Sequence, residues 1–119
     1  MAARGLKAAV RRRNGLAVVE LDGELDGFGE EALNQAFVQA DAARPRAVLL
    51  KFEQVAYINS SGIALVVQLL GRARRAGLPL LACGLSEHFQ EIFRVTRLAD
   101  FVRVVADESG ALRAAPAGS

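Results

Sequence analysis

The order in which apolar patterns change along the chain is the strongest constraint on its fold. A turn at Asn14-Gly15 is followed by two short apolar runs, 47–52 and 80–83, that alternate with stretches whose apolar residues have helical spacing. Asn-Gly tolerates the positive φ angles that a two-residue hairpin needs. Strands that alternate with helices form a parallel sheet covered by those helices. We therefore expect an α/β fold with a hairpin and a mostly parallel mixed sheet of about five strands.

The same patterns locate the individual elements. Strands are expected at 6–10, 16–21, 47–52, 80–83 and, at an edge of the sheet, 101–105; helices are expected at 30–43, 60–76 and 87–95. Glycines at 23, 27 and 29 indicate a loop between the second strand and the first helix. The expected core comprises Val48, Leu49, Leu50, Val66, Val67, Leu70, Leu80, Leu81, Ile92 and Phe93. Residues 1–106 are predicted to form one domain, and 107–119, which are small and polar, a flexible tail.

Composition excludes several classes of protein. The chain has 119 residues, 52% of them hydrophobic, which is enough for one core. No run of 18 apolar residues is present, and Met1–Arg13 lacks the apolar segment of a secretory signal. The single cysteine, Cys83, rules out an internal disulfide and a multi-cysteine metal site, and it fits a core position. We expect a cytoplasmic protein that is not membrane-inserted and has neither metal nor cofactor.

Charge is unevenly distributed, although the net charge is only +2. Basic residues gather near the N-terminus: Arg4, Lys7, Arg11, Arg12 and Arg13. An acidic run follows, with no basic residue among its members: Glu20, Asp22, Glu24, Asp26, Glu30 and Glu31. Such polarity can steer a charged partner. A basic stripe with interleaved aromatic residues is absent, which argues against nucleic-acid binding.

Two adjacent serines, Ser60 and Ser61, lie between an apolar strand and a helix. Asn59 is a good N-cap, so both serines are expected in the first turn of the helix. One interpretation is a helix cap and a turn with no further role. The other is a phosphorylation switch, because a phosphate adds about −1.5 to −2 charges and a helix N-terminus tolerates that charge within its own domain. An acidic or tightly packed partner would then be repelled.

Several segments resemble a known family. The strand Val48–Phe52, followed by Tyr57-Ile58-Asn59-Ser60-Ser61-Gly62-Ile63-Ala64-Leu65, resembles the signature of STAS domains, specifically of bacterial anti-sigma factor antagonists. Val19–Asp26, Leu80–Ser86 and Phe93–Leu98 are also similar to family segments, in the same order. The resemblance covers about Leu6 to Val105. It departs at Asn59, where the family usually has Asp; the cap is kept and a local negative charge is lost.

This resemblance implies a function. Such a domain binds an anti-sigma factor that is also a serine kinase, and binding frees a sigma factor. Phosphorylation of the first serine of the pair, here Ser60 with Ser61 as the alternative, breaks the complex, and a serine phosphatase restores it. The expected partner surface comprises Asp22, Gly23, Glu24, Asp26, Asn59, Ser60, Ser61 and Gly62. The oligomeric state stays open.

A second interpretation is a non-catalytic STAS subunit of a lipid-transport complex or a stress-sensing scaffold, which stays docked without phosphorylation. An enzyme is not expected, because the only histidine, His88, has no recognisable catalytic partner. The G-x-G-x-x-A pattern at 27–32 is rejected as a dinucleotide site, since nearby carboxylates would repel a pyrophosphate. Three arginines of the second helix are expected on a solvated face: Arg72, Arg74 and Arg75.

Overall fold

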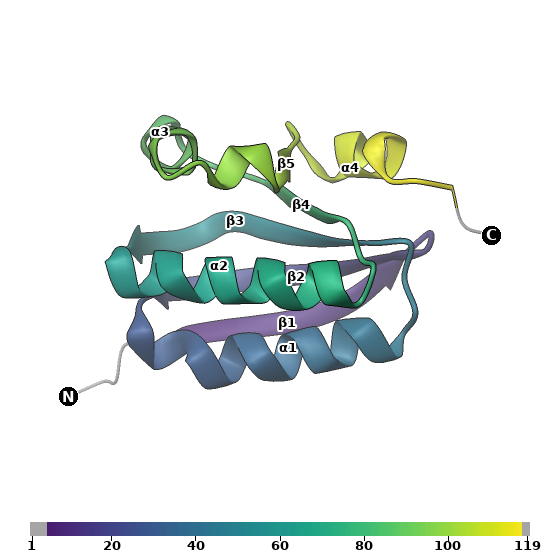
Figure 1. Cartoon of the computed structure of the whole chain (residues 1–119), viewed down its shortest axis with the longest axis horizontal. Coiled ribbons are helices and arrows are strands. Elements are labelled where there is room, and N and C mark those ends of the chain that lie inside the picture. Colours follow the sequence, from purple (N-terminus) through teal and green to yellow (C-terminus); the bar gives the residue numbers. More distant parts are fainter. Residues whose placement is uncertain (1–4, 118–119) are drawn as a thin grey trace.

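A five-stranded sheet in the order β1-β2-β3-β4-β5 forms the centre of the computed structural model, which describes residues 5–117 (Figure 1). The strands are β1 Leu6–Arg13, β2 Leu16–Leu25, β3 Ala47–Ile58, β4 Leu80–Cys83 and β5 Arg103–Val104. β1 and β2 are antiparallel, and every other pair is parallel. The hairpin turn has Asn14 at φ 48° and Gly15 at φ 85°. The expected α/β fold and its N-terminal hairpin are confirmed, and β5 lies at an edge.

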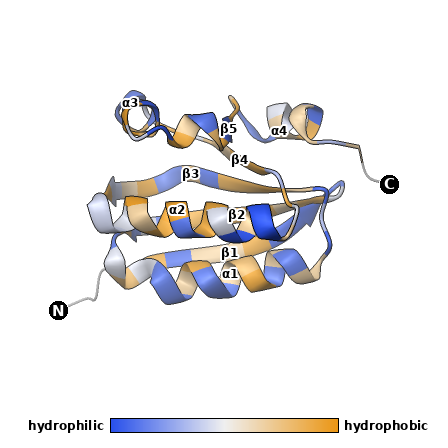
Figure 2. Ribbon diagram, viewed as in Figure 1, coloured by the Kyte–Doolittle hydropathy of each residue, from blue (hydrophilic) through white to orange (hydrophobic). Residues whose placement is uncertain are grey.

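Three helices lie on one face of the sheet: α1 Glu30–Ala42, α2 Ser60–Arg75 and α3 Glu87–Val95. Short 3-10 turns precede α1 (η1, Gly27–Gly29) and follow α3 (η2, Leu98–Asp100). α1 and α2 each carry both hydrophobic and hydrophilic residues, as amphipathic helices do (Figure 2). No helix within residues 5–117 is long and apolar enough to cross a membrane.

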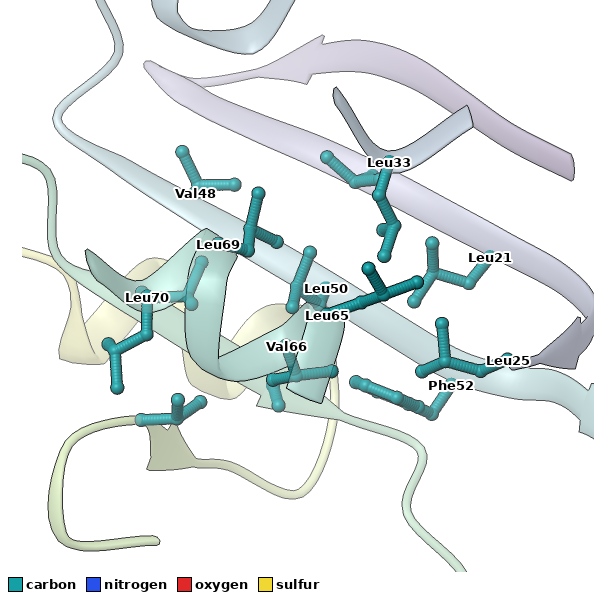
Figure 3. Packing of buried hydrophobic residues seen from close by; sticks show 14 of the residues in the cluster. Leu21, Leu25, Leu33, Val48, Leu50, Phe52, Leu65, Val66, Leu69 and Leu70 are labelled. Atoms are coloured by element: carbon teal, nitrogen blue, oxygen red, sulfur yellow. The ribbon is translucent and has the colours of Figure 1, made fainter. Parts of the chain in front are cut away.

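The larger hydrophobic cluster fills the space between these helices and the sheet. Leu65, Val66 and Leu69 of α2 gather near Leu50 and Phe52 of β3 (Figure 3). The ring of Phe52 meets that of Phe93 edge-on, with centroids 5.6 Å apart, a geometry that aromatic pairs prefer. Eight residues of the expected core are buried: Val48, Leu49, Leu50, Val66, Leu70, Leu80, Leu81 and Phe93.

Two expected core residues are corrected. Val67 is 50% exposed, and Ile92 is only partly buried. The buried stripe of α2 runs through Leu65, Val66, Leu69, Leu70 and Ala73 and turns Val67 outward. Gln68 is the one polar residue between positions 63 and 70. The spacing of the apolar residues therefore does not show which side of the helix faces the sheet.

Arg72 is also placed differently from the expectation of a solvated face. It is half-buried, and its Nη1 donates to Asn34 Oδ1 of α1 at 2.8 Å. Its guanidinium lies 4.7 Å from the centre of the Phe37 ring. Arg72 therefore joins α2 to α1, whereas Arg74 and Arg75 are exposed as expected.

The strands extend further than the apolar runs. β2 continues through Gly23 to Leu25, and β3 continues to Ile58. Gly23, expected in a loop, lies in β2 at φ 115°, and a Cβ there would come 2.1 Å from the carbonyl oxygen of Gly5. Register shifts between β2 and β3 fall at this glycine and just before it. The longer strands carry the chain directly to the start of α2.

A fourth helix, α4 (Glu108–Ala114), corrects the expectation of a flexible tail beginning at residue 107. It packs on the face of the sheet opposite α1–α3, where Ala111 and Ala115 join the buried residues Leu16, Val18, Ala47, Leu49, Leu81 and Cys83. Asp107 caps it, accepting a hydrogen bond from the Gly110 amide at 2.7 Å. The remainder of the expected tail, residues 118–119, and Arg4 of the basic cluster lie outside the described residues.

Candidate functional site

The start of α2 is organised by Asn59. Its backbone is extended, with φ −123° and ψ −176°, and its Oδ1 accepts a hydrogen bond from the Gly62 amide at 2.9 Å. This is the expected N-cap. Ser60 is the first residue of α2, and both Ser60 and Ser61 are exposed. The sequence therefore located the two hydroxyl groups correctly, on the surface in the first turn.

The end of β2 is packed tightly against this turn. A Cβ at Gly62 would lie 1.9 Å from the carbonyl oxygen of Leu25, so only glycine fits. The same carbonyl oxygen accepts a hydrogen bond from the backbone N–H of Asn59 at 3.3 Å. Leu25 and Gly62 are buried. Gly62, expected on the partner surface, thus allows the close approach that fixes the serines instead of facing solvent.

The acidic loop, Asp26–Gly29 with Glu30 at the start of α1, lies beside the serines. Asp26 Oδ1 accepts from the Phe28 amide at 3.0 Å and caps η1. A Cβ on Gly27 would lie 3.5 Å from Cβ of Ser61. Glu30 at the start of α1 is exposed, and Phe28 is 90% exposed. The loop and the serines form one acidic end of the molecule.

Two expected members of the partner surface lie elsewhere. Asp22 is exposed in a hollow of about 580 Å³ on the α4 side of the sheet, together with Lys7, Lys51 and Glu53. It precedes Leu25 by three strand residues, about 10 Å. Gly23 is half-buried at the close approach to Gly5. The structure therefore does not bring Asp22 to Ser60.

Sequence reasoning missed a second cluster, centred on Glu108. Arg11 donates to both carboxylate oxygens, with Nη1 to Oε2 at 3.0 Å and Nη2 to Oε1 at 2.5 Å. Arg13 Nη1 lies 2.8 Å from Oε2, and Lys51 Nζ lies 3.1 Å from Oε1. Arg11 also donates to Glu20. Part of the N-terminal basic cluster therefore fixes α4 to β1 and β3.

The Glu108 cluster also sets the protonation of its members. Hydrogen bonds from Arg11 hold the pKa of the Glu108 carboxyl well below its usual range, and Arg13 and Lys51 add to this effect. The hydrogen bond to Glu108 raises the pKa values of Arg11 and Lys51 in turn. Glu108 is only 9% exposed. Three cations therefore compensate the charge of this buried carboxylate and hold α4 on the sheet. Local sequence spacing does not reveal the cluster, because 97 residues separate Arg11 from Glu108.

Cys83 and His88 lie in contrasting surroundings. Cys83 is fully buried, and this burial raises its thiol pKa to about 11, so the thiol is protonated at neutral pH. His88 is exposed in the first turn of α3, 6.0 Å from the Phe89 ring. No group of three or more potential metal ligands occurs in the part of the chain that the structure describes.

Solved structures of known proteins share this architecture. An anti-sigma factor antagonist from Mycobacterium paratuberculosis matches with a TM-score of 0.74 at 22% identity, over 92% of this chain and 93% of that one. The phosphorylated form of the Bacillus cell fate determinant SpoIIAA matches with a TM-score of 0.66 at 18% identity, over 89% and 97%. A sulfate transporter family protein from Wolinella succinogenes gives 0.74 at 17% identity, over 87% and 86%. At these identities the likeness shows a shared fold.

The sequence itself carries the family assignment. The profile of the STAS domain matches residues 7–111, from β1 into α4, and so includes the Asn59–Gly62 turn. The match covers most of the chain, and the strand order agrees with the fold shared by the solved structures. The chain therefore belongs to the STAS domain family.

Proposed function

We propose that this domain is an anti-sigma factor antagonist that acts in the cytoplasm, binds an anti-sigma factor with serine kinase activity, and is released when Ser60 is phosphorylated. A serine phosphatase restores binding, and the outcome is control of transcription. One observation carries the proposal: Ser60 is an exposed hydroxyl at the first position of a capped helix, at the acidic end of a STAS domain. The likeness to SpoIIAA in its phosphorylated and unphosphorylated forms supports it.

Ser60 suits the modification better than Ser61. Ser61 lies against Gly27 of the acidic loop, whereas Ser60 is the exposed first residue of α2. A phosphate on either serine meets the positive end of the α2 dipole, which stabilises negative charge. The helix cap uses the Asn59 side chain and not a serine hydroxyl. Phosphorylation should therefore leave the fold intact.

The same phosphate should break a complex. The partner surface we propose contains Glu24, Asp26, Asn59, Ser60 and Ser61, and Gly62 beneath it allows the close approach of Leu25. A phosphate buried in a packed interface beside these carboxylates would lose its hydration and be repelled by their negative charges. Desolvated charge clashes cost several kcal/mol. We expect affinity for the partner to fall by at least about a hundredfold.

The test is to incubate the domain with its cognate kinase and ATP, map the phosphate by mass spectrometry, and measure partner affinity before and after. Ser60→Ala should bind without release, and Ser60→Asp should weaken binding only in part because it carries less charge than a phosphate. Ser109→Ala, which removes an exposed serine of α4, is the matched control and should behave like the parent. Phosphate on Ser60 with unchanged affinity would defeat the switch.

The second candidate is an accessory STAS subunit that stays docked on a transporter or scaffold. Asn59 favours it, because the uncharged amide keeps the cap without the carboxylate that the antagonists usually carry. A STAS fold also occurs in the sulfate transporter family protein from Wolinella succinogenes. A phosphate-free domain after kinase treatment, together with stable co-purification with a transporter subunit, would establish this candidate over the first.

A further inference from the structure

An apolar groove of about 330 Å³ lies between α2 and the segment that follows α3. Its apolar lining includes Val67 and Phe101, which are 50% and 54% exposed. Two cations border it: Arg74, whose guanidinium lies 5.6 Å from the centre of the Phe101 ring, and Arg97, whose Nε donates to Asp100 Oδ2 at 2.6 Å. Half-exposed large apolar side chains beside arginines are typical of protein-binding surfaces. The groove therefore fits an apolar side chain flanked by negative charge.

The chain itself carries such a group at its acidic end. Phe28 is 90% exposed in η1, between Gly27 and Gly29. The Asp26 cap fixes the turn, with the Phe28 amide donating to the Asp26 carboxylate at 3.0 Å. Glu30, in the first turn of α1, adds negative charge. Because the cap holds the backbone of this turn and a phenylalanine has only two χ angles, Phe28 loses little conformational entropy on binding and is a good anchor.

We propose that these two surfaces bind each other between copies of this chain, with the Phe28 loop of one copy docked in the Val67–Phe101 groove of the next. The loop does not reach its own groove, because η1 lies on the α1 side of α2 and the groove on the η2 side (Figure 1). Carboxylates beside Phe28 then face Arg74, which gives the contact complementary charge, and Arg97 contributes less because it is paired with Asp100. The contact joins two different surfaces and is therefore heterologous.

The expected strength follows from the size of the contact. One phenylalanine buries about 150–250 Å², so this interface is smaller than that of a stable dimer. Self-association should be weak and should weaken further with salt, which screens the exposed charges. Because Gly27 adjoins Ser61, the loop cannot serve a second copy and a partner over Ser60 at the same time. This inference does not rest on the proposed switch, since it concerns the domain alone.

The experiment is sedimentation equilibrium of the purified domain at low salt, from about 10 μM to about 1 mM, the range of weak contacts. The parent should associate with increasing concentration. Phe28→Ala and the double variant Arg74→Glu/Arg97→Glu should each weaken association at least about tenfold. Two matched controls should associate like the parent: Val38→Ala, which shortens another exposed apolar side chain, and Arg12→Glu, which reverses a charge outside the groove. Circular dichroism checks that each variant is folded.

A charge exchange makes the test decisive. Glu30→Lys/Glu31→Lys reverses the charge at the start of α1, beside the Phe28 loop. Arg74→Glu/Arg97→Glu reverses the charge at the groove. Each double variant alone should stay monomeric, because its loop and its groove then carry charges of the same sign. When the two are mixed, the native loop of one meets the native groove of the other, and association should return. A monomeric parent across the whole range, association that survives Phe28→Ala, or a mixture that stays monomeric would overturn the proposal.

Discussion

The two faces of the sheet are held by different kinds of interaction. On one face, α1, α2 and α3 enclose a continuous apolar cluster that includes Leu50, Phe52 and Phe93. On the other, α4 covers a smaller apolar patch and is fixed by the carboxylate of Glu108 among Arg11, Arg13 and Lys51.

The difference has consequences for stability. Apolar burial depends on the area removed from water, at roughly 25 cal/mol per Å², and hardly responds to pH. A carboxylate held by cations depends on protonation and on a few precise distances. The face covered by α1, α2 and α3 should therefore control global unfolding, whereas the α4 face should open locally under mild changes in conditions.

The largest effect should come from Val66→Asp. Val66 is 1% exposed in the larger cluster, and an unpaired carboxylate there should destabilise the domain by about 4 kcal/mol or more. Its neighbour supplies the control: Val67→Asp places the same charge on a half-exposed position and should change stability by no more than about 0.5 kcal/mol. Thermal melts of both variants measure the contrast. Equal destabilisation by the two would mean that α2 is rotated relative to this structure.

This pair also shows what the sequence could predict. In α1, Leu33, Ala36, Phe37 and Ala40 have helical spacing, and three of the four residues between them are polar, so the spacing matches the side that is buried. In α2 the apolar residues extend around the helix, so spacing could not distinguish Val66 from Val67. The sequence predicted local structure correctly where one or two residues determine it, as in the Asn59 cap and the Asn14-Gly15 turn.

The α4 face could not be predicted for a different reason. Its small buried residues, Ala111 in α4 and Ala115 directly after it, give almost no periodic signal. Its main contact joins Glu108 to Arg11 across 97 residues. Long-range ion pairs leave no trace in local spacing, and an N-terminal arginine cluster is equally compatible with a solvated surface.

The next largest effect should follow from Glu108→Ala, which removes the centre of the charged cluster. The side chains of Arg11 and Arg13 are 42% exposed, so solvent screens the lost attraction. We expect a loss of about 1–2 kcal/mol. Glu91→Ala, which breaks the exposed pair with Arg94, should leave stability nearly unchanged.

Cys83 reports whether that loss is local to α4. The thiol is buried beneath α4 with its pKa raised to about 11, so a thiol reagent should label it only after the face opens. Glu108→Ala should speed labelling under native conditions by roughly tenfold for each 1.4 kcal/mol lost from α4 packing. Slow labelling in a variant that melts earlier would show that α4 and the sheet unfold together, and the two faces would then not be independent.

A smaller effect is expected at the cap of α2. Asn59→Ala removes the acceptor for the Gly62 amide and should cost about 1 kcal/mol. Asn59→Asp keeps the cap, adds a negative charge at the helix N-terminus, and should be at least as stable as the parent. Chemical denaturation distinguishes the two. If both variants are as stable as the parent, the hydrogen bond contributes nothing to the stability of the face covered by α1, α2 and α3.

The smallest effect should be the response of the α4 face to acid. The native pKa of Glu108 is lowered, first by the hydrogen bonds from Arg11, so the unfolded chain takes up its proton at a higher pH than the folded one does. The stabilisation is therefore complete above the unfolded value of about 4.3 and declines as pH falls toward the native value. By pH 4 the parent should lose about 0.5 kcal/mol through this group. Glu108→Gln titrates nothing at this position, so its stability should decline less between pH 6 and pH 4 than that of the parent. Parallel curves for the two proteins would show that the three cations do not hold Glu108 ionised, and α4 would then depend on its apolar contacts alone.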